Sequence, residues 1–142
     1  MSADILDRCN TIEECYEFML AYAAQGLPSD EGSRSGGQIR EYLLRAAKAI
    51  SGLAESCTSV AKQERFEPLE RYQAFFLVLD RDALDSLAAI ELVLAQPAIS
   101  SQLIDNLNAS MHLRALLTDL FLVSEILKPQ AVPAKPMASA AG

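Results

Sequence analysis

The chain contains one histidine, His112, so any chemistry that needs an imidazole must use this residue. Histidine phosphotransfer bundles place a Lys and a small residue one turn after the histidine, whereas the run from residue 112 is HLRAL. Ferritin-like di-iron bundles need two Glu-x-x-His pairs and two further inward carboxylates, which one histidine cannot supply. We expect His112 to be a solvated surface residue, with a pH-sensing or ligand role as the alternative.

Three cysteines, Cys9, Cys15 and Cys57, are an odd and sparse set without a CxxC pair. This count favours neither a disulfide framework nor a zinc site. We expect all three to be reduced and to pack as small hydrophobic residues. No local Cys/His signature accompanies them, so the sequence predicts no catalytic residues, no metal and no cofactor.

Four polar or aromatic residues interrupt the apolar stripes and are candidate contact residues: Glu91, Arg114, Tyr42 and Tyr72. Glu91 and Arg114 are expected to form a salt bridge between helices that fixes their register. A second interpretation makes all four the orienting groups of an apolar ligand pocket. In a third, neither Glu91 nor Arg114 is buried. Asn106 is expected to set register within a helical seam.

The first helix is expected to start at Thr11, whose hydroxyl and Glu14 form a capping box, and to end at Gly26. Residues 2–9 are expected to add at most a short helical turn. Residues 26–37 are rich in Gly, Ser and Asp and predict a loop outside the core. Neither a Walker motif nor a dinucleotide fingerprint fits these glycines, because the required Lys and the preceding strand are both missing.

Apolar residues alternate at spacings of four and three from residue 36 to about residue 63, which predicts one long helix with a heptad seam. The seam residues are Ile39, Leu43, Ala46, Ile50, Leu53, Cys57 and Val60. Gly52 lies inside this pattern and is expected to be tolerated within the helix. A third helix should run from Pro68 to Gln96, with a break near residues 80–82 as an open alternative. A fourth should run from residue 99 or 100 to Leu127.

These elements predict an all-α fold, a helical bundle of about four helices, one short and three long, formed by residues 1–127. Short connections near residues 64–67 and 96–99 make sequential helices antiparallel. Residues 128–142, KPQAVPAKPMASAAG, are Pro- and Ala-rich and are expected to form a disordered C-terminal tail.

The charge balance argues against several partners, since 19 acidic residues against 12 basic ones give a net charge of −7. Such a chain repels phosphate backbones and anionic lipids, so neither nucleic acid nor a membrane surface is an expected partner. The chain has neither a signal-peptide pattern nor an apolar run long enough to span a bilayer. A cytoplasmic location is the default expectation.

The segment from Leu116 to Leu127 is apolar around most of its circumference, more than a helix packed on one side of a bundle requires. We therefore expect a homo-oligomer, most simply a dimer, formed through this segment and the apolar turn at residues 75–79. Two alternatives remain: this helix is the centre of the bundle, or it docks onto a different protein. The predicted interface residues are Phe75, Leu116, Phe121, Leu122, Val123 and Ile126.

The leading functional hypothesis is a non-enzymatic interaction protein, such as an adaptor, regulator or assembly factor, that acts through its apolar helix faces. A carrier or sensor holding a small apolar or aromatic molecule between the helices is the alternative. A third hypothesis is an enzyme or metal protein whose site a single sequence does not reveal.

Overall fold

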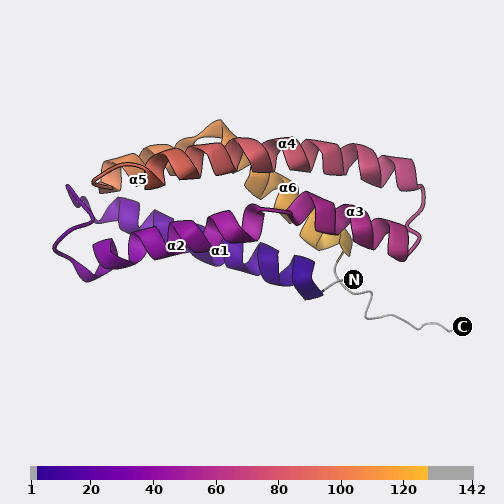
Figure 1. Cartoon of the computed structure of the whole chain (residues 1–142), viewed down its shortest axis with the longest axis horizontal. Helices are drawn as coiled ribbons and strands as arrows, with labels where there is room; N and C mark the ends of the chain where they lie inside the picture. The colour runs from indigo at the N-terminus through magenta and orange to yellow at the C-terminus, as the bar shows by residue number, and fades with distance from the viewer. Residues whose placement is uncertain (1–2, 128–142) are drawn as a thin grey trace, which may run out of the picture.

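The computed structural model describes residues 3–127, which form six helices and no strands (Figure 1). The helices are α1 (Ala3–Ala24), α2 (Arg34–Ile50), α3 (Leu53–Gln63), α4 (Leu69–Leu94), α5 (Ser101–Ala109) and α6 (Met111–Leu127). The predicted all-α fold is therefore confirmed. The predicted tail, residues 128–142, lies outside the described residues.

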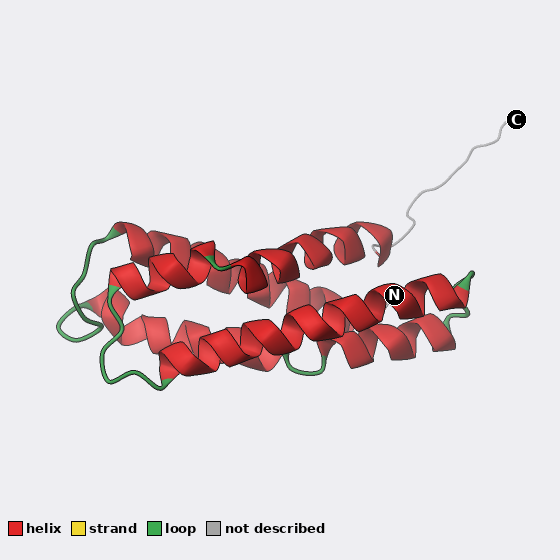
Figure 2. Cartoon of the chain, turned by 90° about the horizontal axis from the view of Figure 1, so that it is seen from above, coloured by secondary structure: helices red, strands yellow, loops and turns green. Residues whose placement is uncertain are grey.

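The six helices make four rods, because α3 continues the line of α2 and α6 follows α5 along the bundle (Figures 1 and 2). Successive rods run in opposite directions. The helix α1 packs mainly against α2 and α5, and α4 packs mainly against α3 and α6. Each rod thus has two neighbours, and one core runs through the middle of the bundle.

The first helix is longer than the capping box at Thr11 predicted, since α1 already includes Ile5 and Cys9. Both residues are fully buried and extend the stripe that Ile12 continues. Burial of this stripe outweighs the local start signal, so the expected start at Thr11 was wrong.

The predicted long helix over residues 36–63 is interrupted at Ser51 and Gly52. Gly52 has φ +82°, a left-handed conformation that glycine adopts without steric cost. Arg8 of α1 binds the end of α2, its Nη1 donating to the carbonyl oxygens of Ala49 (3.1 Å) and Ser51 (2.6 Å). The expectation that Gly52 is merely tolerated in a continuous helix was wrong. All seven predicted seam residues are nevertheless buried on both sides of the break.

The fourth predicted helix is divided at Ser110, which ends α5 and whose hydroxyl accepts a hydrogen bond from the Leu113 amide in α6. A local capping signal therefore divides a segment that we predicted as one helix. Asn106 is exposed and does not set register. The buried asparagine is Asn108, whose amide donates to the Met19 carbonyl oxygen in α1 (3.2 Å). By contrast, α4 is continuous through residues 80–82.

The loop after α1 is bonded to the connection between α4 and α5, although we predicted it to lie outside the core. The Asp30 carboxylate accepts from the Ile99 amide (2.7 Å) and from Arg40 Nε (2.8 Å). The hydroxyl of Tyr22 donates to the Ile99 carbonyl oxygen (2.7 Å). These bonds fix one end of the bundle and leave the long sides of the helices available for other contacts.

Candidate functional site

Glu91 and Arg114, predicted to pair, are both exposed, and within residues 3–127 neither forms an ion pair. Their positions on α4 and α6 are turned outward from the core. Of the three interpretations, the structure agrees with the one in which neither residue is buried. Tyr42 is half-buried, and its ring stacks on Phe18 with centroids 4.1 Å apart and planes 8° apart. It belongs to the packing of α1 on α2.

The six predicted interface residues divide between the core and the surface. Leu116 and Val123 are buried, so they belong to the core face of α6 and their assignment to an interface was wrong. Phe121, Leu122 and Ile126 are exposed. The helix is apolar all round because one side fills the core while others present apolar side chains to solvent.

A second stripe with heptad spacing follows the outer side of the junction between α4 and α6. We call this surface the α4–α6 face. Its α4 residues are Phe75, Val78, Asp82, Asp85, Ala89 and Leu92, and its α6 residues are His112, Ala115, Asp119, Leu122 and Ile126. Spacings of three and four place each set on one side of its helix. Val78, Leu92, Leu122 and Ile126 are all exposed.

Two polar contacts hold α4 and α6 in an antiparallel register along this face. The carboxylate of Asp85 lies 3.9 Å from Nδ1 of His112. The hydroxyl of Ser86, the residue after it, donates to the carbonyl oxygen of His112 (2.9 Å). Further along, the Asp82–Asp119 contact described next places Val78, four residues before Asp82, beside Leu122, three residues after Asp119.

In the middle of the face, the carboxyl groups of Asp82 and Asp119 lie close enough to share a hydrogen bond. Asp119 is 6% exposed, and its Oδ2 has no hydrogen-bond partner. Burial, together with the hydrogen bond and the negative charge of Asp82, raises the pKa of Asp119 to about 7. Asp119 was not singled out from the sequence. The sequence feature that could have identified it is an acidic residue inside the largely apolar run LLTDLFLV.

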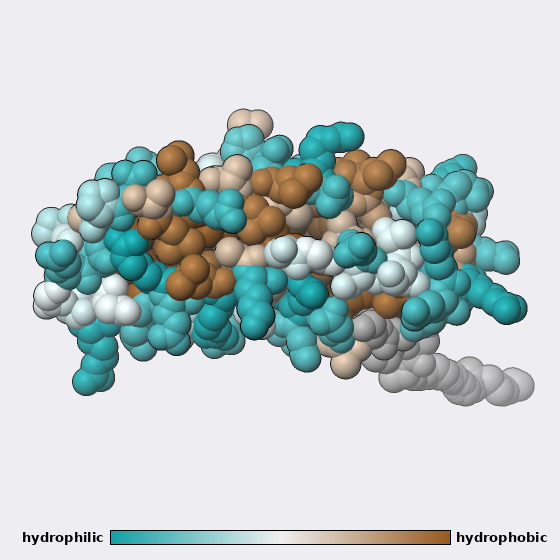
Figure 3. All heavy atoms as spheres, viewed as in Figure 1, coloured by the Kyte–Doolittle hydropathy of each residue, from teal (hydrophilic) through white to brown (hydrophobic). Residues whose placement is uncertain are grey.

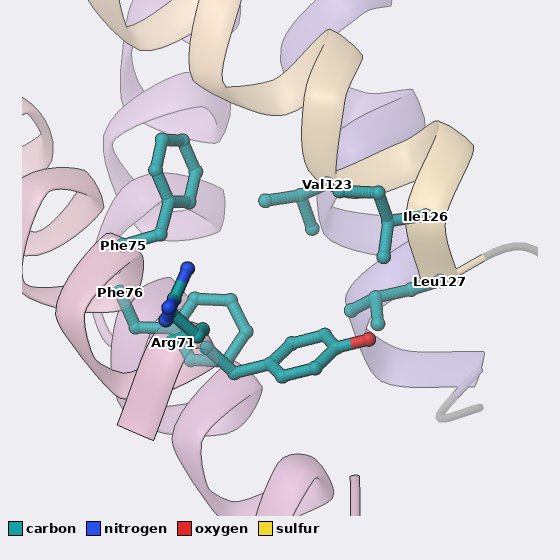
Figure 4. A pocket seen from close by; sticks show the side chains of 7 residues that line it. Arg71, Phe75, Phe76, Val123, Ile126 and Leu127 are labelled. Atoms are coloured by element: carbon teal, nitrogen blue, oxygen red, sulfur yellow. The ribbon is translucent and has the colours of Figure 1, made fainter. Parts of the chain in front are cut away.

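At the end of the face, a pocket of about 310 Å³ opens between the first turns of α4 and the last turns of α6 (Figure 4). It is lined by Arg71, Tyr72, Phe75, Phe76, Val123, Ile126 and Leu127. Figure 4 shows the Arg71 side chain between the rings of α4, with Val123 and Ile126 facing it across the opening. Tyr72, a predicted contact residue, therefore does line a pocket, whereas the other three do not.

Comparison of the chain with protein-family models, curated proteins and solved structures finds no match. Function must therefore be argued from the residues themselves. Within residues 3–127, no three His, Cys, Asp or Glu side chains are grouped as a metal ion requires. No helix in that range is both long and apolar enough to cross a membrane.

Other exposed apolar residues lie on separate sides of the bundle. Leu77 borders a hollow formed with α3, and Leu44 projects from α2. Figure 3 shows apolar side chains along the line where α4 passes over α2 and α3. The α4–α6 face differs from this area because it combines two aligned stripes that carry exposed apolar residues, a pocket and a group of carboxylates.

Proposed function

We propose that this protein is a non-enzymatic helical-bundle interaction protein that associates with a second copy of itself through the α4–α6 face. The observation that carries the proposal is the second heptad stripe on each of the two helices. Such stripes are the normal means by which helices bury one another, and among residues 3–127 no other helix packs over this pair. Large exposed apolar areas on a small bundle mark interaction surfaces.

A second copy is the occupant that this surface favours. The face carries both signs of charge, because Arg71 lies at one end and Asp82 and Asp85 lie further along α4. A surface with cations at one end and anions at the other is complementary to itself when a two-fold axis reverses one copy. An adaptor, regulator or assembly factor requires such a surface.

The proposal predicts that a short bis-maleimide reagent cross-links Val78→Cys into a covalent dimer and cross-links Leu77→Cys poorly. Val78 is on the α4–α6 face and 40% exposed, while its neighbour Leu77 points to another side and is 66% exposed. The three native cysteines are buried, and burial raises the pKa of the Cys57 thiol to about 12, so they react slowly. Denaturing gel electrophoresis at low protein concentration measures the yield. Equal yields, or a higher yield for Leu77→Cys, would contradict this surface.

The pocket at the end of the face favours a second candidate function, a carrier or sensor for a small amphipathic carboxylate. Its walls are aromatic and aliphatic, and the one charged side chain that lines it, Arg71, makes no ion pair within residues 3–127. An apolar pocket with a cation at its opening suits a ligand with a hydrocarbon body and an anionic head.

This second candidate predicts that decanoate raises the melting temperature in proportion to the logarithm of its concentration, whereas decanol, with the same chain, raises it less. Arg71→Ala should remove the difference between the two compounds. A melting temperature unaffected by either compound would rule out the carrier function while leaving the self-association proposal intact.

A further inference from the structure

The charges on the α4–α6 face follow an order that specifies how a second copy would dock. On α4, Arg71, Val78 and Asp85 are seven residues apart, so they lie almost directly in line along the helix. The cation is about 10 Å before Val78 and the anion is about 10 Å after it, at 1.5 Å per residue. A helix with this pattern matches a reversed copy of itself and repels a parallel one.

We propose that, in the self-association described above, two copies of α4 cross antiparallel with Val78 at the two-fold axis, so that Arg71 of each copy pairs with Asp85 of the other. The inference rests on the proposed function, since it requires that the α4–α6 face meets a second copy. It adds the relative orientation of the two chains and the residue that each contributes to the other.

The surroundings of both residues agree with this pairing. Arg71 is exposed and forms no ion pair within residues 3–127. Asp85 is about half exposed, and its carboxylate lies 3.9 Å from His112, a contact that is an ion pair only when the histidine is protonated. Asp82 and the buried Asp119 add carboxyl groups to the middle of the face, and within residues 3–127 none of the three carboxylates forms an ion pair with a Lys or Arg. In the dimer, the long side chain of Arg71 from each copy would bring a guanidinium group to the Asp85 carboxylate of the other copy.

The apolar part of the face fits the same arrangement. An axis at Val78 brings the two Val78 side chains together and places Leu122 of each copy beside the same contact, because Leu122 is the neighbour of Val78 across the junction. The resulting interface has an apolar centre with one salt bridge on either side, as stable protein interfaces commonly have.

A charge-swap experiment tests the orientation by sedimentation velocity of the full chain. Wild type should dimerise, and Arg71→Glu and Asp85→Arg should each raise the dimer dissociation constant at least tenfold. The double variant should return it to within about threefold of wild type. Mixing the two single variants should also form a heterodimer, because both opposite-charge pairs are restored in it. Lys62→Glu, which makes the same change of charge at an exposed position on α3 away from this face, should behave as wild type.

The possible failures are distinguishable. A wild-type chain that stays monomeric would overturn the proposed function together with this inference. A dimer that is indifferent to both single swaps, or two single variants that fail to associate when mixed, would overturn the antiparallel register and leave self-association standing. Circular dichroism of each variant checks that the helices are formed.

Discussion

Asp119→Asn is expected to stabilise the protein at pH 8 by between about 1 and 4 kcal/mol, an unusual sign for a substitution at a buried position. Asp119 is buried beside the Asp82 carboxyl, and one of its oxygens has no partner. The amide of asparagine has nearly the same shape, carries no charge and can donate a hydrogen bond to Asp82. Replacement therefore removes a buried charge without leaving a cavity.

The pH dependence follows from the raised pKa. In the unfolded chain Asp119 has its ordinary pKa of 3.8, and in the folded protein the value is about 7. Between these values the folded state binds more protons than the unfolded state, so stability falls as the pH rises through this window and levels off above it. A shift of one pKa unit corresponds to about 1.4 kcal/mol, so the stability lost by ionising Asp119 has an upper limit on the order of 4 kcal/mol. The charged group that acts on this carboxyl is Asp82 of α4.

Urea unfolding followed by circular dichroism at pH 5 and pH 8 measures the effect. The advantage of Asp119→Asn should be clearly larger at pH 8 than at pH 5, because at pH 5 only part of the window between the two pKa values has been crossed. Asp80→Asn is the matched control, because Asp80 is an exposed carboxylate on the neighbouring helix α4 and its removal changes the net charge by the same amount. A stabilisation that is equal at both pH values, or equal in the control, would mean that burial of the carboxyl is not its cause.

The sequence predicted the helical class and the core seams correctly because these depend on apolar spacing, which survives local changes in the backbone. The seam residues from Ile39 to Val60 are all buried, although one helix ends at Ile50 and the next begins at Leu53. The same spacing hid the break, since a short left-handed step at glycine preserves the alignment of the stripe. The residues that mark the break, Ser51 and Gly52, are visible in the sequence, but we expected Gly52 to be accommodated within a continuous helix.

Tertiary contacts decided the features that local signals left ambiguous. The hydroxyl of Thr11 suggested a helix start, yet burial of Ile5 and Cys9 extends α1 to its N-terminal side. Ser110, conversely, does interrupt the last long segment, although the apolar pattern suggested continuity. A single Ser or Thr in an apolar segment therefore does not show whether its hydroxyl caps a helix end at that position.

The candidate site was found in part. The exposed apolar residues Leu122 and Ile126 were predicted, but Leu116 and Val123 fill the core. A helix that is apolar on all sides does not reveal which side meets its own bundle. The Asp82–Asp119 pair was missed because the two residues lie far apart in the sequence and match no spacing motif. Only the antiparallel packing of α4 and α6 brings them together.

The central claim, that a second copy binds the α4–α6 face, is tested most directly by multi-angle light scattering behind a sizing column on wild type, Leu122→Glu and Leu44→Glu. Leu122 lies on the face and is 49% exposed, and Leu44 lies on α2 and is 59% exposed, so both can accept a charge without loss of the fold. We predict a wild-type mass of two chains, a folded monomer for Leu122→Glu, and a dimer for Leu44→Glu. A monomeric wild type, or a dimer that survives Leu122→Glu and is lost in Leu44→Glu, would contradict the account.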